Sequence, residues 1–137
     1  MNTYCLVRPE HLNHHGYLFG GSMLKWVDEY AWLTASLDFP RCPLVTMALN
    51  DIVFKERIKN GSILRFSVLP DHQGRTSMTY TVEVFADAPG DAVERLVFAT
   101  RITFVHVGPD GCKAPLPARA VYRSQSPGSL PGAQALS

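Results

Sequence analysis

One long helical segment with apolar residues on two faces constrains this chain more than any other feature. The segment follows Gly20-Gly21-Ser22 and stops before Pro40. Its apolar residues recur at helical spacing on two stripes, one of Leu24, Val27, Ala31 and Ala35 and the other of Trp26, Tyr30, Leu33 and Leu37. A surface helix carries one such stripe, so two stripes predict a helix that is covered on most sides. Ser22 is the expected N-cap.

The rest of the chain reads as strands. Residues 44–55, 62–69, 77–86 and 93–107 are rich in Val, Ile, Phe, Tyr and Thr, and a short apolar piece at 4–7 precedes the helix. The third segment alternates most clearly, with one face formed by Met78, Tyr80, Val82 and Val84. Turn-like separators lie between these segments. The pattern predicts an α+β fold, a long central helix wrapped by a curved antiparallel sheet of about five strands.

Composition limits the class of protein. A length of 137 residues with 46% hydrophobic and 18% charged residues indicates one domain with a real core, which we place at 1–117, and a loosely ordered tail at 118–137. A net charge of +1 argues against nucleic acid as a partner. Short apolar runs and a polar N-terminus argue against a membrane span or export. The three cysteines lack CxxC spacing, so we expect a reduced, cytoplasmic protein.

Asp28 is the most informative single residue. It lies in the middle of the helical segment, four residues after Leu24 and four before Trp32, on an apolar stripe. A carboxylate in apolar surroundings has a raised proton affinity, which suits a general base. The alternative is that Asp28 faces a solvated groove or pairs with an arginine such as Arg101.

The glycine pair at the start of the helix is the second feature. Glycines let a ligand approach the backbone, and the N–H groups of a first helical turn attract negative charge. A carbonyl oxygen over the N–H of Gly21 would be polarised, which is oxyanion stabilisation. A tight turn before a packed helix is the alternative. Asn13 and Gly16 add an amide and a flexible point to the preceding loop.

Together these residues resemble a known signature. The run N-H-H-G-Y-L-F-G-G from Asn13 to Gly21, followed by M-L-K-W-V-D up to Asp28, is similar to that of hot-dog-fold acyl-CoA thioesterases, and of their YciA-like acyl-CoA hydrolase branch in particular. The resemblance continues through residues 45–48, 54–55, 74–77 and 103–107, and covers roughly 4–117.

The resemblance implies a hot-dog fold that pairs with a second copy, so that active sites lie at the interface of a homodimer; tetramers or hexamers are possible further assemblies. The aspartate matching Asp28 would act as general base or nucleophile on the thioester. Asn13 of the facing subunit would place the water or the carbonyl, and the N–H of Gly21 would polarise it. Acyl-CoA and water would give a carboxylic acid and CoA, with no metal or organic cofactor.

The resemblance also implies where the substrate binds. Gly20 and His15 would contact it at the mouth of the site. The turn before the strand segment at 77–86 would contact the CoA moiety, with Arg75 pairing with phosphate; it comprises Gly74, Arg75, Thr76 and Ser77.

The chain departs from the family pattern in three places. Histidines occupy positions 14 and 15, where small or polar residues are usual. Lys55-Glu56-Arg57-Ile58 stands where a Lys-Pro-apolar turn is common. Bulky aromatic residues on the helix would shorten the acyl site and favour short, medium or aromatic acyl groups; they are Trp26, Tyr30 and Trp32.

Other functions stay open at this stage. An enoyl hydratase or dehydratase of the same fold would use a histidine near the helix start with a helical carboxylate, which His15 and Asp28 could imitate. A non-catalytic acyl-CoA binding module would retain the fold without the chemistry. A zinc site at His11, His14 and His15 lacks a completing cluster, and Cys42 lacks an activating neighbour.

Overall fold

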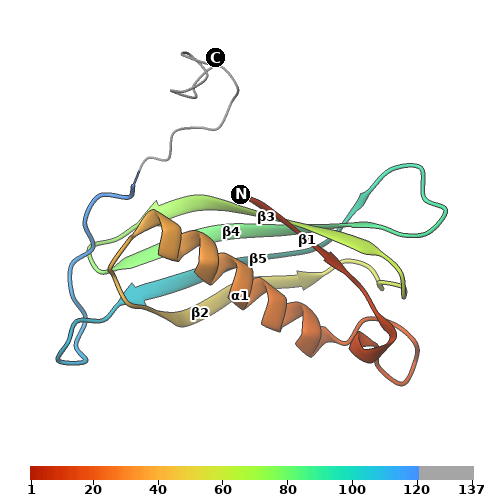
Figure 1. The fold of residues 1–137 in the computed structure, drawn as a ribbon, viewed down its shortest axis with the longest axis horizontal. Helices are drawn as coiled ribbons and strands as arrows, with labels where there is room; N and C mark the ends of the chain where they lie inside the picture. Colours follow the sequence, from red (N-terminus) through yellow and green to blue (C-terminus); the bar gives the residue numbers. More distant parts are fainter. Residues whose placement is uncertain (121–137) are drawn as a thin grey trace, which may run out of the picture.

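The computed structural model describes residues 1–120, which form one α-helix against a single five-stranded sheet (Figure 1). In chain order the elements are β1 (Asn2–Leu6), a 3-10 turn (Pro9–His11), α1 (Gly20–Asp38), β2 (Leu44–Phe54), β3 (Ile63–Gln73), β4 (Ser77–Asp87) and β5 (Arg95–His106). The strands lie in the order β1-β3-β4-β5-β2, and every neighbouring pair is antiparallel. The predicted α+β architecture is confirmed; most of the expected tail, 121–137, lies outside the described residues.

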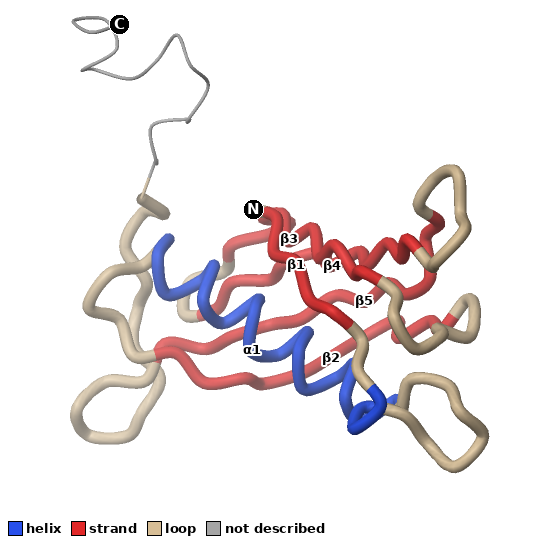
Figure 2. The backbone as a smooth tube through the Cα atoms, turned by 45° about the vertical axis from the view of Figure 1, so that its right-hand side comes forward, coloured by secondary structure: helices blue, strands red, loops and turns tan. Residues whose placement is uncertain are grey.

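The core lies between α1 and the face of the sheet that the helix crosses. Both overall views show α1 running across one side of the twisted strands (Figures 1 and 2). The alternation predicted for 77–86 is confirmed, because Met78, Tyr80, Val82 and Val84 are all buried on this inner face. The helix contributes Met23, Trp26, Val27, Ala31 and Ala35. Each large apolar side chain buried here stabilises the fold by about 1.5–3 kcal/mol.

The helix differs from its prediction in two respects. It begins at Gly20 rather than after Ser22, and its N-cap is Phe19, whose carbonyl oxygen accepts from the N–H groups of Ser22 and Met23. Coverage on most sides was also wrong for the single chain, since Leu37 is 50% exposed and Trp32 is 43% exposed. One helix against one sheet therefore leaves an apolar face of α1 open.

The C-terminal end of α1 is held by a buried carboxylate. Asp38 is 4% exposed, and one of its oxygens accepts a 2.6 Å hydrogen bond from the hydroxyl of Tyr80 on β4. The other oxygen lies 3.8 Å from the guanidinium of Arg119. The N–H of Ala120 donates to the backbone carbonyl of Asp38 at 2.8 Å. These contacts fix the helix to the sheet and to the segment that follows β5.

The N-terminal strand contacts α1 through Cys5 and Tyr30. Burial raises the pKa of Tyr30 to about 12, and a hydrogen bond with the Cys5 thiol adds to the effect. Burial likewise raises the pKa of Cys5. Because the thiolate is the nucleophilic form, Cys5 is a packing group at neutral pH. Within residues 1–120 no helix combines the length and apolar content needed to cross a bilayer.

The Asp38–Tyr80 pair generates a stability prediction. Tyr80→Phe keeps the buried ring but removes the donor to Asp38, so we expect the free energy of unfolding to fall by about 1–3 kcal/mol. Tyr4→Phe, on the exposed side of β1, is the matched control and should change it by less than about 0.5 kcal/mol. Denaturant unfolding of both variants measures the difference. Equal stabilities would contradict the anchoring role of the pair.

Candidate functional site

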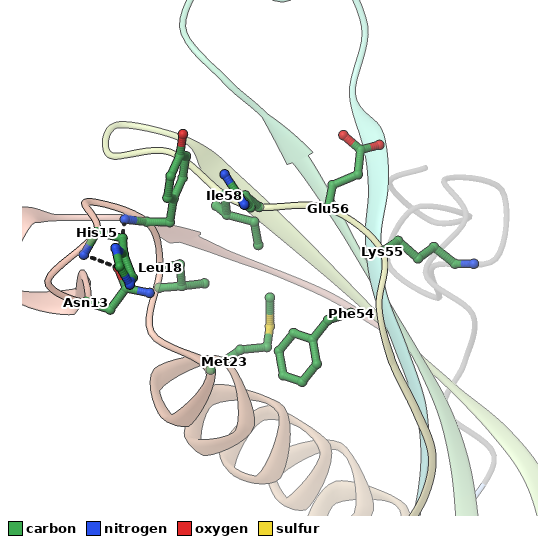
Figure 3. Close-up of a pocket in the computed structure, with 11 residues that line it drawn as sticks. Asn13, His15, Leu18, Met23, Phe54, Lys55, Glu56 and Ile58 are labelled. Carbon is green, nitrogen blue, oxygen red and sulfur yellow. Dashed lines mark hydrogen bonds between the residues drawn. The ribbon is translucent and has the colours of Figure 1, made fainter.

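Two hollows beside α1 each contain some of the predicted site residues. The larger, about 550 Å³, lies at the helix N-terminus and includes Asn13, His15 and Gly20 in its lining (Figure 3). The smaller, about 440 Å³, is a groove between the middle of α1 and the start of β2, and Asp28 lies in its wall. We refer to them as the helix-start cavity and the Asp28 groove.

Asp28 faces the groove with a hydrogen-bond donor beside it. The hydroxyl of Thr46 donates to one carboxylate oxygen of Asp28 at 2.5 Å. Deep burial of Asp28 was a wrong expectation, since the residue is only half-buried. Arg101 is not its partner but pairs with Asp71 at 2.7 Å. The solvated groove, which the sequence left open as an alternative, is what the structure shows.

Sequence reasoning missed Thr46 as a site residue. It belongs to the family-like stretch at 45–48, but nothing in its local pattern marks it as a partner of Asp28. The contact arises because the first residues of β2 pass alongside α1. Trp32, one helical turn beyond Asp28, is held in the same groove by a 3.2 Å hydrogen bond from its indole N–H to the carbonyl of Leu44. The aromatic bulk expected to shorten the acyl site therefore lies in this groove only at Trp32.

Asn13 closes the loop that leads into the helix. Its side-chain oxygen accepts hydrogen bonds from the N–H groups of His15 (2.9 Å) and Tyr17 (3.2 Å). Gly16 adopts a φ of 85°, which L-residues rarely take, and thereby tightens the loop. With the oxygen occupied, the Nδ2 group has no partner among residues 1–120 and can only donate.

Of the glycine pair at the start of α1, only Gly21 is closely packed. A Cβ on Gly21 would lie 2.8 Å from the ring of Phe19, whereas one on Gly20 would lie 3.5 Å from the ring of Phe54. By their position at the helix start, both N–H groups lack an intrahelical acceptor. At Gly21, close packing against Phe19 and a backbone N–H that can polarise a carbonyl can therefore occur together.

The Arg75 turn lies at the other end of the sheet from the helix-start cavity. Gly74 and Ser77 close it through a 2.8 Å backbone hydrogen bond, and Arg75 is exposed. Ser77 pairs with Val105, which pairs with Val45 in the wall of the Asp28 groove. Two strand spacings, about 10 Å, therefore separate this turn from the groove.

One chain does not bring all the predicted residues together. Eight helical residues, about 12 Å, separate Gly20 from Asp28, and no residue lines both hollows. The structure joins Asn13 with His15 and Gly20, and Asp28 with Thr46. The two groups lie in separate places on the single chain.

The histidines are engaged in local contacts. His14 and His15 stack on each other with ring centres 3.9 Å apart, and His11 accepts a hydrogen bond from the N–H of Arg8. No group of three or more His, Cys, Asp or Glu side chains within residues 1–120 has an arrangement that could hold a metal ion.

Comparison with known proteins identifies the family. The thioesterase superfamily profile matches residues 15–93, and the chain belongs to this superfamily. Mouse acyl-coenzyme A thioesterase 11 is 34% identical over 82 residues, which are 60% of this chain and 14% of that protein. Human cytosolic acyl coenzyme A thioester hydrolase is 28% identical over 114 residues, 82% of this chain and 30% of that protein. The chain spans less than a third of the length of these relatives.

Solved structures extend the match to the fold. An acyl-CoA hydrolase from Staphylococcus aureus, in complex with butyryl-CoA, CoA and CoA disulfide, has a TM-score of 0.78 at 27% identity over 86% of this chain and 71% of that one. A hexameric hotdog fold thioesterase of Campylobacter jejuni has a TM-score of 0.75 at 30% identity over 84% and 88%. The hot-dog fold is thereby confirmed, while the YciA-like branch stays a prediction.

Three further matches, each 26% identical, are alanine variants of the Staphylococcus aureus hydrolase at an asparagine, an aspartate and a threonine. In that hydrolase the aspartate follows the asparagine by fifteen positions. Asp28 follows Asn13 at the same spacing.

The Asn13 contacts generate a prediction that needs no substrate. Asn13→Ala removes the acceptor for two loop amides, so we expect the N–H groups of His15 and Tyr17 to exchange with solvent about tenfold faster. Asn13→Asp keeps an acceptor oxygen and should preserve their protection. Hydrogen exchange followed by NMR distinguishes the variants. Unchanged exchange in the alanine variant would show that Asn13 does not close the loop.

Proposed function

We propose that this protein is an acyl-CoA thioesterase that hydrolyses acyl-CoA to a carboxylic acid and CoA. The observation that carries the proposal is the Asp28 carboxylate in an open groove with the Thr46 hydroxyl on one oxygen. Membership of the thioesterase superfamily and the names of the similar proteins support it.

Asp28 acts as general base or nucleophile in this proposal. Thr46 orients the carboxylate by binding one oxygen, which leaves the second oxygen to take a proton from water or to attack the carbonyl. The carbon–sulfur bond breaks, oxygen from water ends in the acid, and the departing thiolate takes up a proton. These steps use water and this chain's own groups, so no metal or organic cofactor is part of the proposal.

A homodimer completes the site in this proposal. β2 is an edge strand with exposed apolar side chains, including Met47, Val53 and Phe54. Exposed strand edges of this kind favour pairing with another strand. A two-fold axis through paired β2 edges would set the Thr46 end of one copy against the Phe54 end of the other. Asp28 would then face the helix-start cavity of the partner copy, with its Asn13 and Gly21.

Each remaining residue has a role in the shared site. The Nδ2 group of Asn13 donates to the water or carbonyl, and the N–H of Gly21 stabilises the oxyanion. The shared asparagine-to-aspartate spacing supports the first of these roles. Gly20 and His15 contact substrate at the mouth. The CoA phosphates lie near the Arg75 turn, with Gly74, Thr76 and Ser77 supplying its shape and polar groups.

The assembly and location are part of the same proposal. The hexameric Campylobacter jejuni protein supports association of dimers into a larger oligomer. A cytoplasmic location suits a CoA thioester substrate, and the human relative is named a cytosolic hydrolase.

Removal of the carboxylate tests the chemistry. We expect Asp28→Asn to lower kcat for butyryl-CoA by about 10²–10⁴-fold, because an amide cannot serve as general base. Glu29→Gln, which neutralises the next carboxylate along the helix, is the matched control and should stay within about twofold of wild type. Thiol release measures turnover, and size-exclusion chromatography checks assembly. Full activity of Asp28→Asn would overturn the mechanism, and hydration of crotonyl-CoA without thiol release would favour the hydratase alternative.

Subunit mixing tests whether the site is shared. Asn13→Ala and Asp28→Ala chains are each expected to be inactive, yet a heterodimer of the two contains one site with both native residues. Random exchange should therefore restore about a quarter of wild-type activity. Mass spectrometry of intact dimers confirms exchange. Proven exchange without recovered activity would place the complete site within one chain.

A further inference from the structure

Arg57 stands over an aromatic ring at the rim of the helix-start cavity. Its guanidinium carbon lies 5.1 Å from the ring centre of Tyr17, and both residues line the cavity. A guanidinium over a ring is attracted to the ring face through its charge, and its N–H groups can still donate to another partner. The edge of a guanidinium matches the two oxygens of a carboxylate. Arg57 has no ion pair within residues 1–120, so its guanidinium is available to bind an anion.

Among the charged residues around the cavity, Arg57 is the cation placed to bind an anion at the rim. Glu56, the one carboxylate in the lining, is ion-paired with Arg95, which also lies 3.4 Å from Asp91. Figure 3 shows the side chain of Lys55 directed away from Met23 and the cavity floor. An anion at the rim would therefore meet Arg57 without a competing free carboxylate.

The floor of the cavity is apolar. Leu18, Met23, Phe54 and Ile58 gather there, below the polar rim (Figure 3). An apolar floor under a cationic rim suits an aliphatic chain that ends in a negative group.

The direction of the substrate follows from the proposed function, on which this inference rests. The thioester lies between Asp28 of one copy and Gly21 of the other. The CoA phosphates extend toward the Arg75 turn, on the side of the Asp28 groove. The acyl group then points the opposite way, into the cavity beside Gly20.

We propose that the helix-start cavity holds the acyl group. Arg57, at the rim of the cavity, binds a carboxylate at the end of the acyl group that is remote from the thioester. The preferred substrates are thioesters of dicarboxylic acids, linked to CoA through one carboxyl group and ionised at the other. Arg57 is a specificity-determining residue that reads the end of the acyl chain, while Tyr17 holds its guanidinium in place.

Matched substrate pairs test this assignment. Succinyl-CoA against butyryl-CoA, adipoyl-CoA against hexanoyl-CoA and suberoyl-CoA against octanoyl-CoA differ within each pair only in the terminal group. We expect Arg57→Gln to lower kcat/KM for the carboxylated member of at least one pair by about fivefold to tenfold, while the neutral member changes little. Lys55→Gln removes a charge from the same loop and is the control, with an unchanged ratio. Added salt should lower the wild-type ratio through screening.

The outcomes separate the two proposals. An equal loss for both members of every pair would assign Arg57 to the CoA part and overturn the inference, and so would an unchanged ratio in Arg57→Gln. Calorimetry with the corresponding thioether analogues, which cannot be hydrolysed as thioesters, measures their affinity for the protein independently of catalysis. Preference for the carboxylated thioether that disappears in Arg57→Gln supports the inference even if no thioester is cleaved, a result that would count against the proposed function alone. Absence of that preference in wild type overturns the inference.

Discussion

The width of one helix against five strands is the constraint on which the structure depends. A helix is about 10 Å across with its side chains, whereas five strands at about 4.8 Å spacing extend roughly 20 Å. α1 therefore packs onto part of the inner face and leaves much of β2 and part of its own Trp32 side exposed. The Asp28 groove forms in this uncovered strip, between the helix and the first residues of β2. The same geometry that limits the core thus provides a place for a solvated carboxylate beside apolar surface.

Hydrogen bonds hold the two side chains to which the proposed mechanism assigns roles, Asp28 and Asn13. Thr46 occupies one oxygen of Asp28, and two loop amides occupy the side-chain oxygen of Asn13. Each contact fixes a functional group and leaves one face of it free, a carboxylate oxygen in the first case and an amide donor in the second. Because the two side chains lie in separate hollows, the proposed symmetric dimer would set the acceptor of one chain opposite the donor of the other.

A chain with a net charge of +1 must bind an anionic substrate through local groups. Arg75 and Arg57 lie toward opposite ends of the sheet, Arg75 at the end that carries the Asp28 groove and Arg57 at the helix-start cavity. In the proposed dimer the two arginines bracket one substrate, with the phosphates at one end and the acyl terminus at the other. Glu56 strengthens this division, because its pairing with Arg95 keeps a carboxylate from neutralising Arg57.

The sequence by itself determined the helix, the alternation of β4 and the α+β class, because hydrophobic periodicity and turn residues depend only on residues close together in the chain. It also placed Asn13, Gly21 and Asp28 in one family-like pattern. It failed at the N-cap, where the backbone of Phe19 serves without a side chain, and at the burial of Asp28. Only the tertiary structure decided that Thr46 meets Asp28, that Arg57 lies over the ring of Tyr17, and that Asn13 and Asp28 line two separate hollows. Each of these depends on how β2 and the loop after it pass the helix, and that path is set by strand pairing across the sheet rather than by any local spacing.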